Sequence, residues 1–184
     1  SYPNVDGVVA FTHKGGCSYD IKHGHKILQR VLAGMARHPN IGGYLLIGLG
    51  CEVNQVPGLV KDYQLDQLHE GENAPTFLTI QQTGGVRKTV ESAINAVNEL
   101  LPKVNKFCRT NQPISKLKLA MNCGGSDSNS GVSANPALGI ASDKLVKSGA
   151  TSVFGETTEI YGAEHLLTRR ASSLEVGQKL ISQI

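Results

Sequence analysis

Three cysteines, Cys17, Cys51 and Cys123, stand in glycine-rich polar segments that each follow a short apolar run. His13 precedes Cys17 by four residues, and Glu52 directly follows Cys51. Imidazole, thiolate and carboxylate groups are ligands of iron and zinc in proteins. These five residues are therefore the predicted metal ligands.

The pair His13 and Cys17 is open to other interpretations. Gly15 and Gly16 lie between them, and each would cost about 1 kcal/mol in a helix, so a loop that turns both side chains toward one point is favoured over a helical turn. A thiol beside an imidazole base is also the arrangement of a cysteine hydrolase. A third interpretation is a packed cysteine with a hydrogen-bonded histidine. No single nucleophile stands out among three similar thiols, which favours the metal site.

Acid and base groups are predicted after the last apolar run, in the segment "GETTEIYGAEH". Glu156 is nearest the end of that run and is the best candidate for a general base or a metal ligand. His165 is an alternative base or acid, and also a residue that could simply pack on a helix. The predicted catalytic residues are Glu156, His165 and His13.

Amide, hydroxyl and glycine residues in the same segments are predicted to bind substrate. Gly84 and Gly85 open a helix whose free N–H groups, with the nearby Arg87 and Lys88, would attract an anion such as a carboxylate. Simple capping of helices is the alternative role. The spacing matches neither the phosphate loop GxxxxGK[ST] nor GxGxxG, so nucleotide binding is not supported. The complete predicted set is Asn54, Gln55, Gln82, Thr83, Gly84, Gly85, Ser126, Asp127 and Ser130.

These residues need a scaffold that brings them together, and the apolar pattern suggests one. Short apolar runs typical of buried strands alternate with helical patterns, and the strands begin about 30 to 40 residues apart, as in repeated βαβ units. We therefore predict a Rossmann-like parallel sheet of about five strands with helices on both faces, and a pocket at the carboxyl ends of its strands. The predicted strands cover 7–12, 43–48, 75–81, 117–122 and 151–155; the predicted helices cover 25–37, 56–67, 86–107 (with a break or kink at Pro102), 137–148 and one or two segments within 162–184.

Composition narrows the class of protein. The 184 residues are 40% hydrophobic and 18% charged, with a net charge of +3, which is typical of a globular domain. Residues 1–184 are expected to form a single α/β region, with a subdivision near 112–116 as an alternative. Basic residues are scattered, so nucleic-acid binding is not supported. No run has membrane length, and the four cysteines show no paired spacing, so we expect a cytoplasmic chain with free thiols and no membrane partner.

The combined motifs resemble the altronate dehydratase and galactarate dehydratase family, which includes sulfolactate sulfo-lyase large subunits. The motifs are "HKGGCS", "ARHPNIGGYLLIGLGCEVNQ", "IQQTGGVRKT", "NCGGSDSNSGVSANPALG" and "ETTEIYGAEHLLTRRA", and they run over nearly the whole chain. Ser18 stands where many members have glycine. The ending "GAEHLL" favours the altronate type.

The resemblance implies a hydro-lyase that uses Fe²⁺ to convert altronate into 2-keto-3-deoxygluconate. Galactarate dehydratase and sulfolactate sulfo-lyase are the alternative activities, and a non-catalytic dimerisation or assembly module is the alternative of another class. Mn²⁺, or an iron–sulfur cluster on the three thiols, could replace the single iron. The resemblance also implies a homodimer, a small anionic sugar acid as substrate, and a longer protein whose small N-terminal domain and C-terminal portion are missing here, so that the isolated chain could be inactive.

Overall fold

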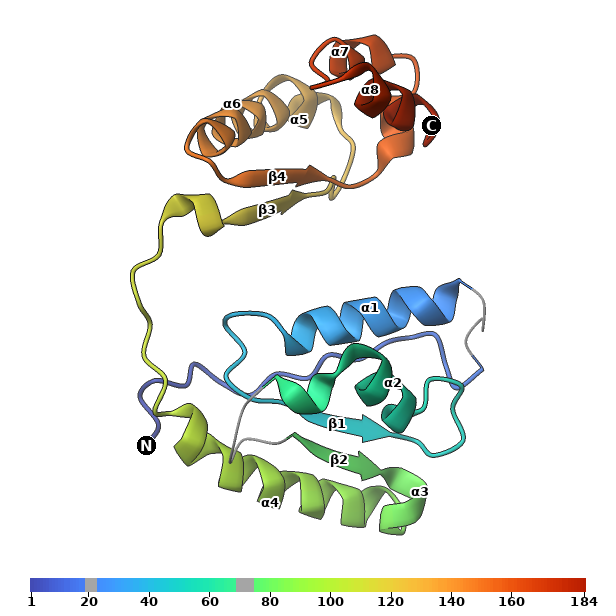
Figure 1. Cartoon of the computed structure of the whole chain (residues 1–184), viewed down its shortest axis with the longest axis vertical. Helices are drawn as coiled ribbons and strands as arrows, with labels where there is room; N and C mark the ends of the chain where they lie inside the picture. The colour runs from blue at the N-terminus through green and yellow to red at the C-terminus, as the bar shows by residue number, and fades with distance from the viewer. Residues whose placement is uncertain (19–22, 69–74) are drawn as a thin grey trace. The chain divides into compact units, whose positions relative to one another are not determined.

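The computed structural model describes residues 1–18, 23–68 and 75–184. The chain divides into two compact units, unit 1 from Ser1 to Arg109 and unit 2 from Thr110 to Ile184. Each unit is built around one pair of parallel strands (Figure 1).

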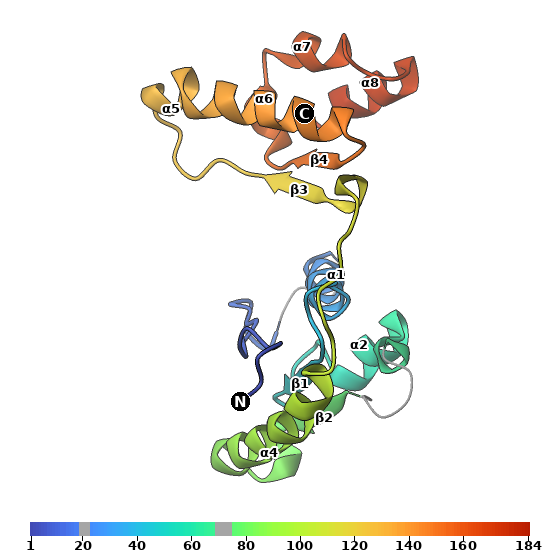
Figure 2. The same cartoon turned by 90° about the vertical axis from the view of Figure 1, so that its left-hand side faces the viewer.

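Unit 1 consists of a strand pair between helical layers. Strands β1 and β2 pair in parallel, with Leu45 opposite Thr76 and Gly48 opposite Thr79. Helix α4 lies on one face of the pair and α2 on the other, with α1 packed against α2 (Figures 1 and 2). The elements are α1 (Gly24–Ala36), β1 (Leu45–Gly48), α2 (Val56–Tyr63), the 3-10 helix η1 (Leu65–Gln67), β2 (Thr76–Thr79), α3 (Ile80–Thr83) and α4 (Val86–Val104).

Local sequence explains where the helices of unit 1 begin and end. Helix α2 starts after the extended Gln55 and has a proline in its first turn, a position where the missing N–H costs nothing. It ends at Gln64, which has φ of 48°. Helix α4 follows Gly84 and Gly85, both with positive φ, and continues through Pro102 to Val104. The sequence predicted a break or a kink at Pro102. The break is wrong, because the helix continues through that residue.

The core of unit 1 lies between α1, α2 and β1. Its buried members are Ala33, Ala36, Val56, Leu59, Val60 and Leu65. Leu65 is fully buried, with 0% exposure. The Tyr44 hydroxyl donates a hydrogen bond to the carbonyl oxygen of Leu65 and so ties the residue before β1 to the start of η1.

The two ends of unit 1 are joined by a polar clasp. The Asn4 backbone N–H donates to Asn105 Oδ1 at 3.0 Å, and Asn4 Nδ2 donates to the Asn105 carbonyl at 2.8 Å. Asp6 and Arg109 form an exposed ion pair beside them. The first and last residues of unit 1 therefore lie at one place.

Unit 2 repeats the strand–helix–strand order with a thinner interior. Strands β3 and β4 pair in parallel, and α6 covers one face of the pair (Figure 2). Among the described residues of unit 2, Ala150 is the one buried hydrophobic residue; the buried Ser142 donates from its hydroxyl to that of Ser152 at 2.8 Å. The elements are η2 (Ile114–Lys116), β3 (Lys118–Met121), α5 (Ser128–Val132), α6 (Ala134–Lys147), β4 (Thr151–Phe154), η3 (Thr157–Ile160), α7 (Glu164–Thr168) and α8 (Leu174–Ile181).

The predicted five-stranded Rossmann-like sheet is wrong. The fold is α/β, but its strands form two separate two-stranded parallel sheets, β1–β2 and β3–β4. The βαβ spacing correctly indicated the crossover through α2 and the crossover through α6. It also suggested that α4 returns the chain to the same sheet, whereas the strand that follows α4 pairs only with β4 within the described residues. Spacing alone does not distinguish these cases.

Residues 7–12 do not form the predicted first strand. Val8 and Val9 are 67% and 66% exposed, and no described strand pairs with their backbone. Val8 instead lines an apolar groove of about 400 Å³ with Ile47 of β1 and residues of α4, including Val90. The apolar run was therefore wrongly predicted to be a buried strand, because its residues are exposed and Val8 only lines the edge of this groove.

The predicted helices are confirmed to within a few residues, including two short ones within 162–184. The predicted helix over 56–67 appears as α2 followed by η1, because the left-handed Gln64 interrupts it. Within 1–18, 23–68 and 75–184, no helix combines the length and the apolar character needed to cross a membrane.

Candidate functional site

In unit 1, three loops meet at the carboxyl ends of β1 and β2. The Val53 N–H donates to the Cys17 carbonyl at 2.9 Å, which places the Cys17 segment beside the loop after β1. The Gln81 N–H donates to the Leu49 carbonyl at 3.1 Å. Gln81 Nε2 also donates to Cys51 Sγ at 3.2 Å, so an amide side chain from the end of β2 reaches a thiol from the end of β1. The structure thus brings Cys17, Cys51 and Gln81 into one set of contacts.

Glu52 braces the loop after β1 with both carboxylate oxygens. Oε1 accepts the Leu49 N–H at 2.9 Å, and Oε2 accepts the Gly50 N–H at 2.5 Å. A Cβ atom on Gly48 would lie 2.4 Å from Glu52 Oε1, so glycine at 48 leaves room for the carboxylate. Gln55 completes the loop, because its Nε2 donates to the carbonyls of Gly50 and Glu52. Two predicted site residues, Glu52 and Gln55, therefore shape the loop that carries Cys51.

Two buried polar atoms in unit 1 lack a hydrogen-bond partner within the described part of the chain. They are Asn54 Oδ1, in the loop before α2, and His25 Nδ1, in the first turn of α1. Buried polar atoms in folded proteins nearly always have a partner, in the protein or in a bound molecule. Asn54 was predicted to bind substrate. His25 was not predicted, because in the sequence it is one of two histidines at a helix start and no spacing singles it out.

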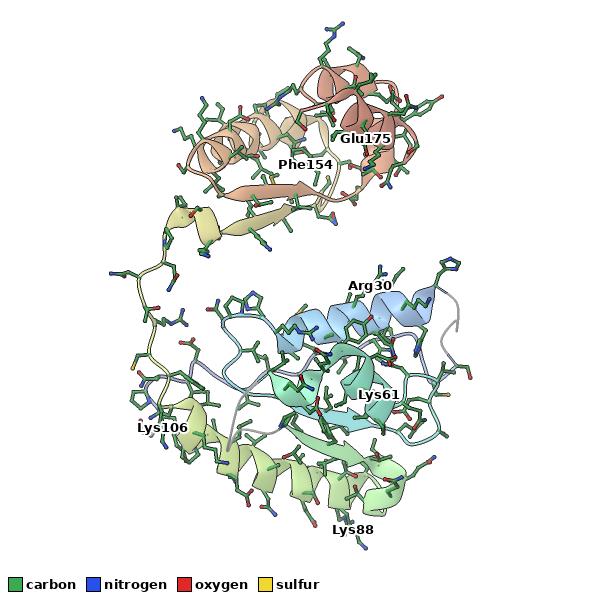
Figure 3. All side chains as sticks on the ribbon, viewed as in Figure 1. Arg30, Lys61, Lys88, Lys106, Phe154 and Glu175 are labelled. Carbon is green, nitrogen blue, oxygen red and sulfur yellow. The ribbon has the colours of Figure 1, made fainter. Side chains whose placement is uncertain are left out.

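At the start of α4, no described side chain caps the backbone N–H groups. Gly84 and Gly85 adopt φ of 91° and 105°, and Thr83 is engaged in a hydrogen bond from its hydroxyl to the Thr79 carbonyl at 2.8 Å. Lys88, labelled on the first turn of α4 in Figure 3, lies over Gly84, where a Cβ atom would be 3.5 Å from its Nζ. Gln82 is exposed on α3. Uncapped N–H groups beside an ammonium are suited to a carboxylate.

In unit 2, the ends of β3 and β4 are joined by a carboxylate. Met121 pairs with Phe154, the last residue of β4, which Figure 3 labels. Cys123 and Glu156 lie two residues after Met121 and Phe154, respectively, and the Cys123 N–H donates to Glu156 Oε2 at 2.9 Å. Cys123 Sγ lies 3.3 Å from the Ser126 hydroxyl. The structure therefore brings together the predicted residues Cys123, Ser126 and Glu156.

Asp127 and Ser130 cap the short helix α5. Asp127 Oδ1 accepts the Ser130 N–H at 2.7 Å, and the Ser130 hydroxyl donates to the Asp127 carbonyl at 2.8 Å. An aspartate at the N-cap position is a common device for satisfying the free N–H groups of a helix start. The structure thus shows these two predicted substrate-binding residues in a capping role.

The predicted proton-transfer histidines, His13 and His165, are both exposed. His165 lies on α7, directly after Glu164. The backbone N–H of Gly162 donates to the Glu164 carboxylate at 2.7 Å and lowers the pKa of that carboxyl, and His165 lowers it further. His13 stands in the irregular segment that leads to Cys17.

A metal centre is not assembled by the described residues alone. All four cysteines are free and exposed. Within the residues that the structure describes, no group of three or more His, Cys, Asp or Glu side chains is arranged to hold an ion. Glu52, one of the predicted ligands, uses both oxygens on backbone N–H groups. The predicted iron site therefore remains a prediction.

Comparison with known protein families gives two matches that follow the two units. Residues 1–105 match the family described as D-galactarate dehydratase/altronate hydrolase, second domain. Residues 114–184 match the family described as D-galactarate/altronate dehydratase, C-terminal.

Curated relatives cover nearly all of the chain. It is 35% identical over 179 residues to an altronate dehydratase of Bacillus subtilis, covering 97% of this chain and 34% of that protein. It is 41% identical over 157 residues to a galactarate dehydratase (L-threo-forming) of Escherichia coli, covering 84% of this chain and 30% of that protein. It is 29% identical over 181 residues to a (2R)-sulfolactate sulfo-lyase subunit beta of Chromohalobacter salexigens, covering 96% of this chain and 43% of that protein. The chain thus spans about a third of the length of the dehydratases it matches.

Proposed function

Because the chain belongs to the D-galactarate dehydratase/altronate hydrolase family, we propose that it forms part of a hydro-lyase that removes water from altronate to give 2-keto-3-deoxygluconate. The observation that carries the proposal is the similarity to an altronate dehydratase over 97% of the chain. Galactarate is the second candidate substrate, favoured by the higher identity, 41%, to a galactarate dehydratase.

The proposed reaction needs a base and an acid. The base removes the proton from the carbon beside the carboxylate, the electrons of that C–H bond form a C=C bond, and the hydroxyl leaves the next carbon as water when an acid protonates it. The resulting enol then becomes the keto acid. His13, an exposed imidazole in unit 1 whose type suits proton transfer near neutral pH, is proposed for one of these steps. Glu156, another predicted group, is engaged with Cys123 and is considered below.

Substrate binding is proposed at the strand ends of unit 1. Asn54 Oδ1, which has no hydrogen-bond partner among the residues that the structure describes, could accept a hydrogen bond from a substrate hydroxyl, which would satisfy that buried atom. The substrate carboxylate is proposed to lie at the uncapped start of α4, where Gly84 and Gly85 expose the backbone and Lys88 supplies positive charge. The iron predicted from the resemblance remains a separate proposal, and neither step depends on it. A homodimer likewise remains a proposal, to be tested by light scattering.

The test is an assay of this chain, and of any longer protein that contains it, with altronate, galactarate and sulfolactate. We expect release of a 2-keto-3-deoxy acid from altronate, and a loss of about 10²-fold or more in kcat for His13→Ala, the usual scale for removal of a proton-transfer group. Glu175→Ala is the control, since Glu175 is exposed and forms an exposed ion pair with Lys179. No keto acid from any of the three substrates would contradict the proposed function.

The same protein tests the iron proposal. Anaerobic loading followed by metal analysis should show bound Fe²⁺ that is lost in Cys17→Ala and Cys51→Ala if the thiols hold it. Retention of iron in both variants would show that these thiols are not ligands. Dehydration by metal-free protein would show that iron is not needed.

A further inference from the structure

Glu156 has a backbone conformation that its position in the fold does not by itself require. Its φ is 58° and its ψ is 50°, the left-handed region that few residues other than glycine adopt. Among the described residues, one other non-glycine residue, Gln64, has positive φ. Gln64 ends helix α2, where a left-handed residue is common. Glu156 follows a strand, so a different reason must hold it there.

The parallel register supplies that reason. Met121 pairs with Phe154, and the Gly155 N–H donates to the Met121 carbonyl at 2.9 Å, which is the last ladder bond of the pair. The chain then turns at Glu156, and the turn aims its carboxylate back at the neighbouring loop. Oε2 accepts the Cys123 N–H at 2.9 Å. A hydrogen bond from an N–H to a carboxylate is stronger than one between neutral groups.

The residue that Glu156 holds in this way, Cys123, carries one of the three thiols of the predicted site. Cys123 Sγ lies 3.3 Å from the Ser126 hydroxyl, so fixing the Cys123 backbone also fixes the start of the segment that presents this hydroxyl. Glycines at 124 and 125 follow, and a Cβ atom on either would meet no atom within 4 Å, so packing does not hold this part of the loop. The hydrogen bond from the Cys123 N–H to the Glu156 carboxylate is a contact between the two loops that can hold it.

We propose that Glu156 is a positioning residue for the proposed dehydratase reaction, on which this inference rests. Its carboxylate fixes the Cys123 backbone, and thereby the thiol of Cys123 and the hydroxyl of Ser126, at the carboxyl ends of β3 and β4. It does so by accepting one backbone N–H, and it does not itself take a proton from the substrate.

Three substitutions separate this role from that of a base. Glu156→Gln keeps an oxygen that can accept the N–H but cannot act as a base. Glu156→Gly removes the side chain and adopts positive φ without strain, so it leaves the backbone turn intact. Glu156→Ala removes the side chain and disfavours the turn. Glu175→Gln and Glu175→Ala are the matched controls, since that carboxylate is exposed on α8 (Figure 3).

The first measurement, on the Cys123 amide proton, does not require the protein to be enzymatically active. In the 184-residue chain, the amide proton of Cys123 should resonate downfield and exchange with solvent slowly. In Glu156→Gly the downfield shift should disappear and exchange should be faster on the order of tenfold, the factor that loss of one charge-assisted hydrogen bond allows. Glu156→Gln should keep most of the shift, and both Glu175 variants should match the unmutated chain. A Cys123 amide unaffected by Glu156→Gly would overturn the inference.

The second readout is kcat wherever dehydration is measurable. Glu156→Gln should keep at least about tenfold more kcat than Glu156→Gly, because only the former can hold Cys123. Equal loss in the two variants, with the Cys123 amide still held in Glu156→Gln, would show that Glu156 acts as the base and would overturn the inference. Absence of dehydration by the unmutated protein contradicts the proposed function alone, because the amide readout is independent of it.

Discussion

Unit 1 and unit 2 have similar contacts at the ends of their strands but different interiors. In both, the residue two places beyond the second strand reaches a cysteine that follows the first. Gln81 donates to the Cys51 thiol in unit 1, and Glu156 accepts the Cys123 N–H in unit 2. Beneath these contacts, unit 1 has a cluster of buried aliphatic residues around Leu65, whereas unit 2 has Ala150 as its buried hydrophobic residue within the described part of the chain.

The comparison teaches that the parallel register, and not the size of the core, places these contacts. A parallel pair aligns the residues that follow its two strands, whatever packs beneath it. The identity of the contacting group can then differ, an amide in one unit and a carboxylate in the other. Stability and site geometry should therefore respond to different substitutions, and the predictions below test that separation from the largest effect to the smallest.

The largest effect is expected for Leu65→Ala. Removing a fully buried leucine side chain costs about 2–5 kcal/mol through lost burial and the cavity that remains, and Leu65 is 0% exposed. Hydrogen exchange followed by mass spectrometry, resolved by peptide, should show the loss in unit 1 and not in unit 2. Leu174→Ala is the control, since Leu174 is 90% exposed. An equal loss in both units would show that they unfold together and would break the comparison.

The next effect is expected for Ser142→Ala in unit 2. The Ser142 hydroxyl is buried and donates to Ser152 at 2.8 Å, and loss of such a bond costs about 1 to 2 kcal/mol. Because unit 2 has little apolar burial, this loss should raise the rate of amide hydrogen exchange throughout β3, β4 and α6. Ser148→Ala, which removes an exposed hydroxyl bonded to the Lys144 carbonyl, should change it much less. Equal effects of the two variants would mean that unit 2 does not depend on its buried polar contact.

The smallest effect is expected for Tyr44→Phe in unit 1, about 1 kcal/mol for the hydrogen bond to Leu65. Burial is the main cause that raises the pKa of Tyr44 above its ordinary value of 10.0. The folded state therefore favours the neutral phenol. This contribution is fully present below pH 10 and is lost as the pH rises through the raised pKa.

Thermal melts between pH 9 and about pH 11 should thus show a steeper alkaline loss in the unmutated chain than in Tyr44→Phe. Tyr2→Phe serves as the control, since Tyr2 is 40% exposed. Identical alkaline profiles for all three proteins would contradict the role given to Tyr44.

Much of the local structure could be predicted from the sequence. Apolar runs of strand length and periodic helical segments located the four strands and the main helices, because these patterns depend on burial over a few residues. The arrangement of strands into sheets could not be predicted, since it depends on which edges pair over long separations. The segment 7–12 shows the same limit, because Val8 lines the groove beside α4 and β1 but the segment pairs with no described strand.

The candidate site could also be predicted only in part, because residue type and position do not show which contacts form in the folded chain. Residue type and position after a strand pointed to Cys51, Cys123 and Glu156, and the structure places these residues in contacts between strand ends. The sequence could not show that Glu52 and Asp127 use their carboxylates on backbone N–H groups, because capping and ligand binding favour the same residue types. Gln81 and His25 were missed because only the folded chain shows their contacts and burial.

The polar clasp of unit 1 has a consequence for how the unit connects to other sequence. Asn4 and Asp6 hold the chain where Asn105 and Arg109 leave it. A unit whose first and last residues lie close together can be inserted into another polypeptide, or circularly permuted, without separating the segments that flank it. Modular transfer of this unit between polypeptides of different length would need no redesign of its interior, only of the few polar side chains that fasten its two ends.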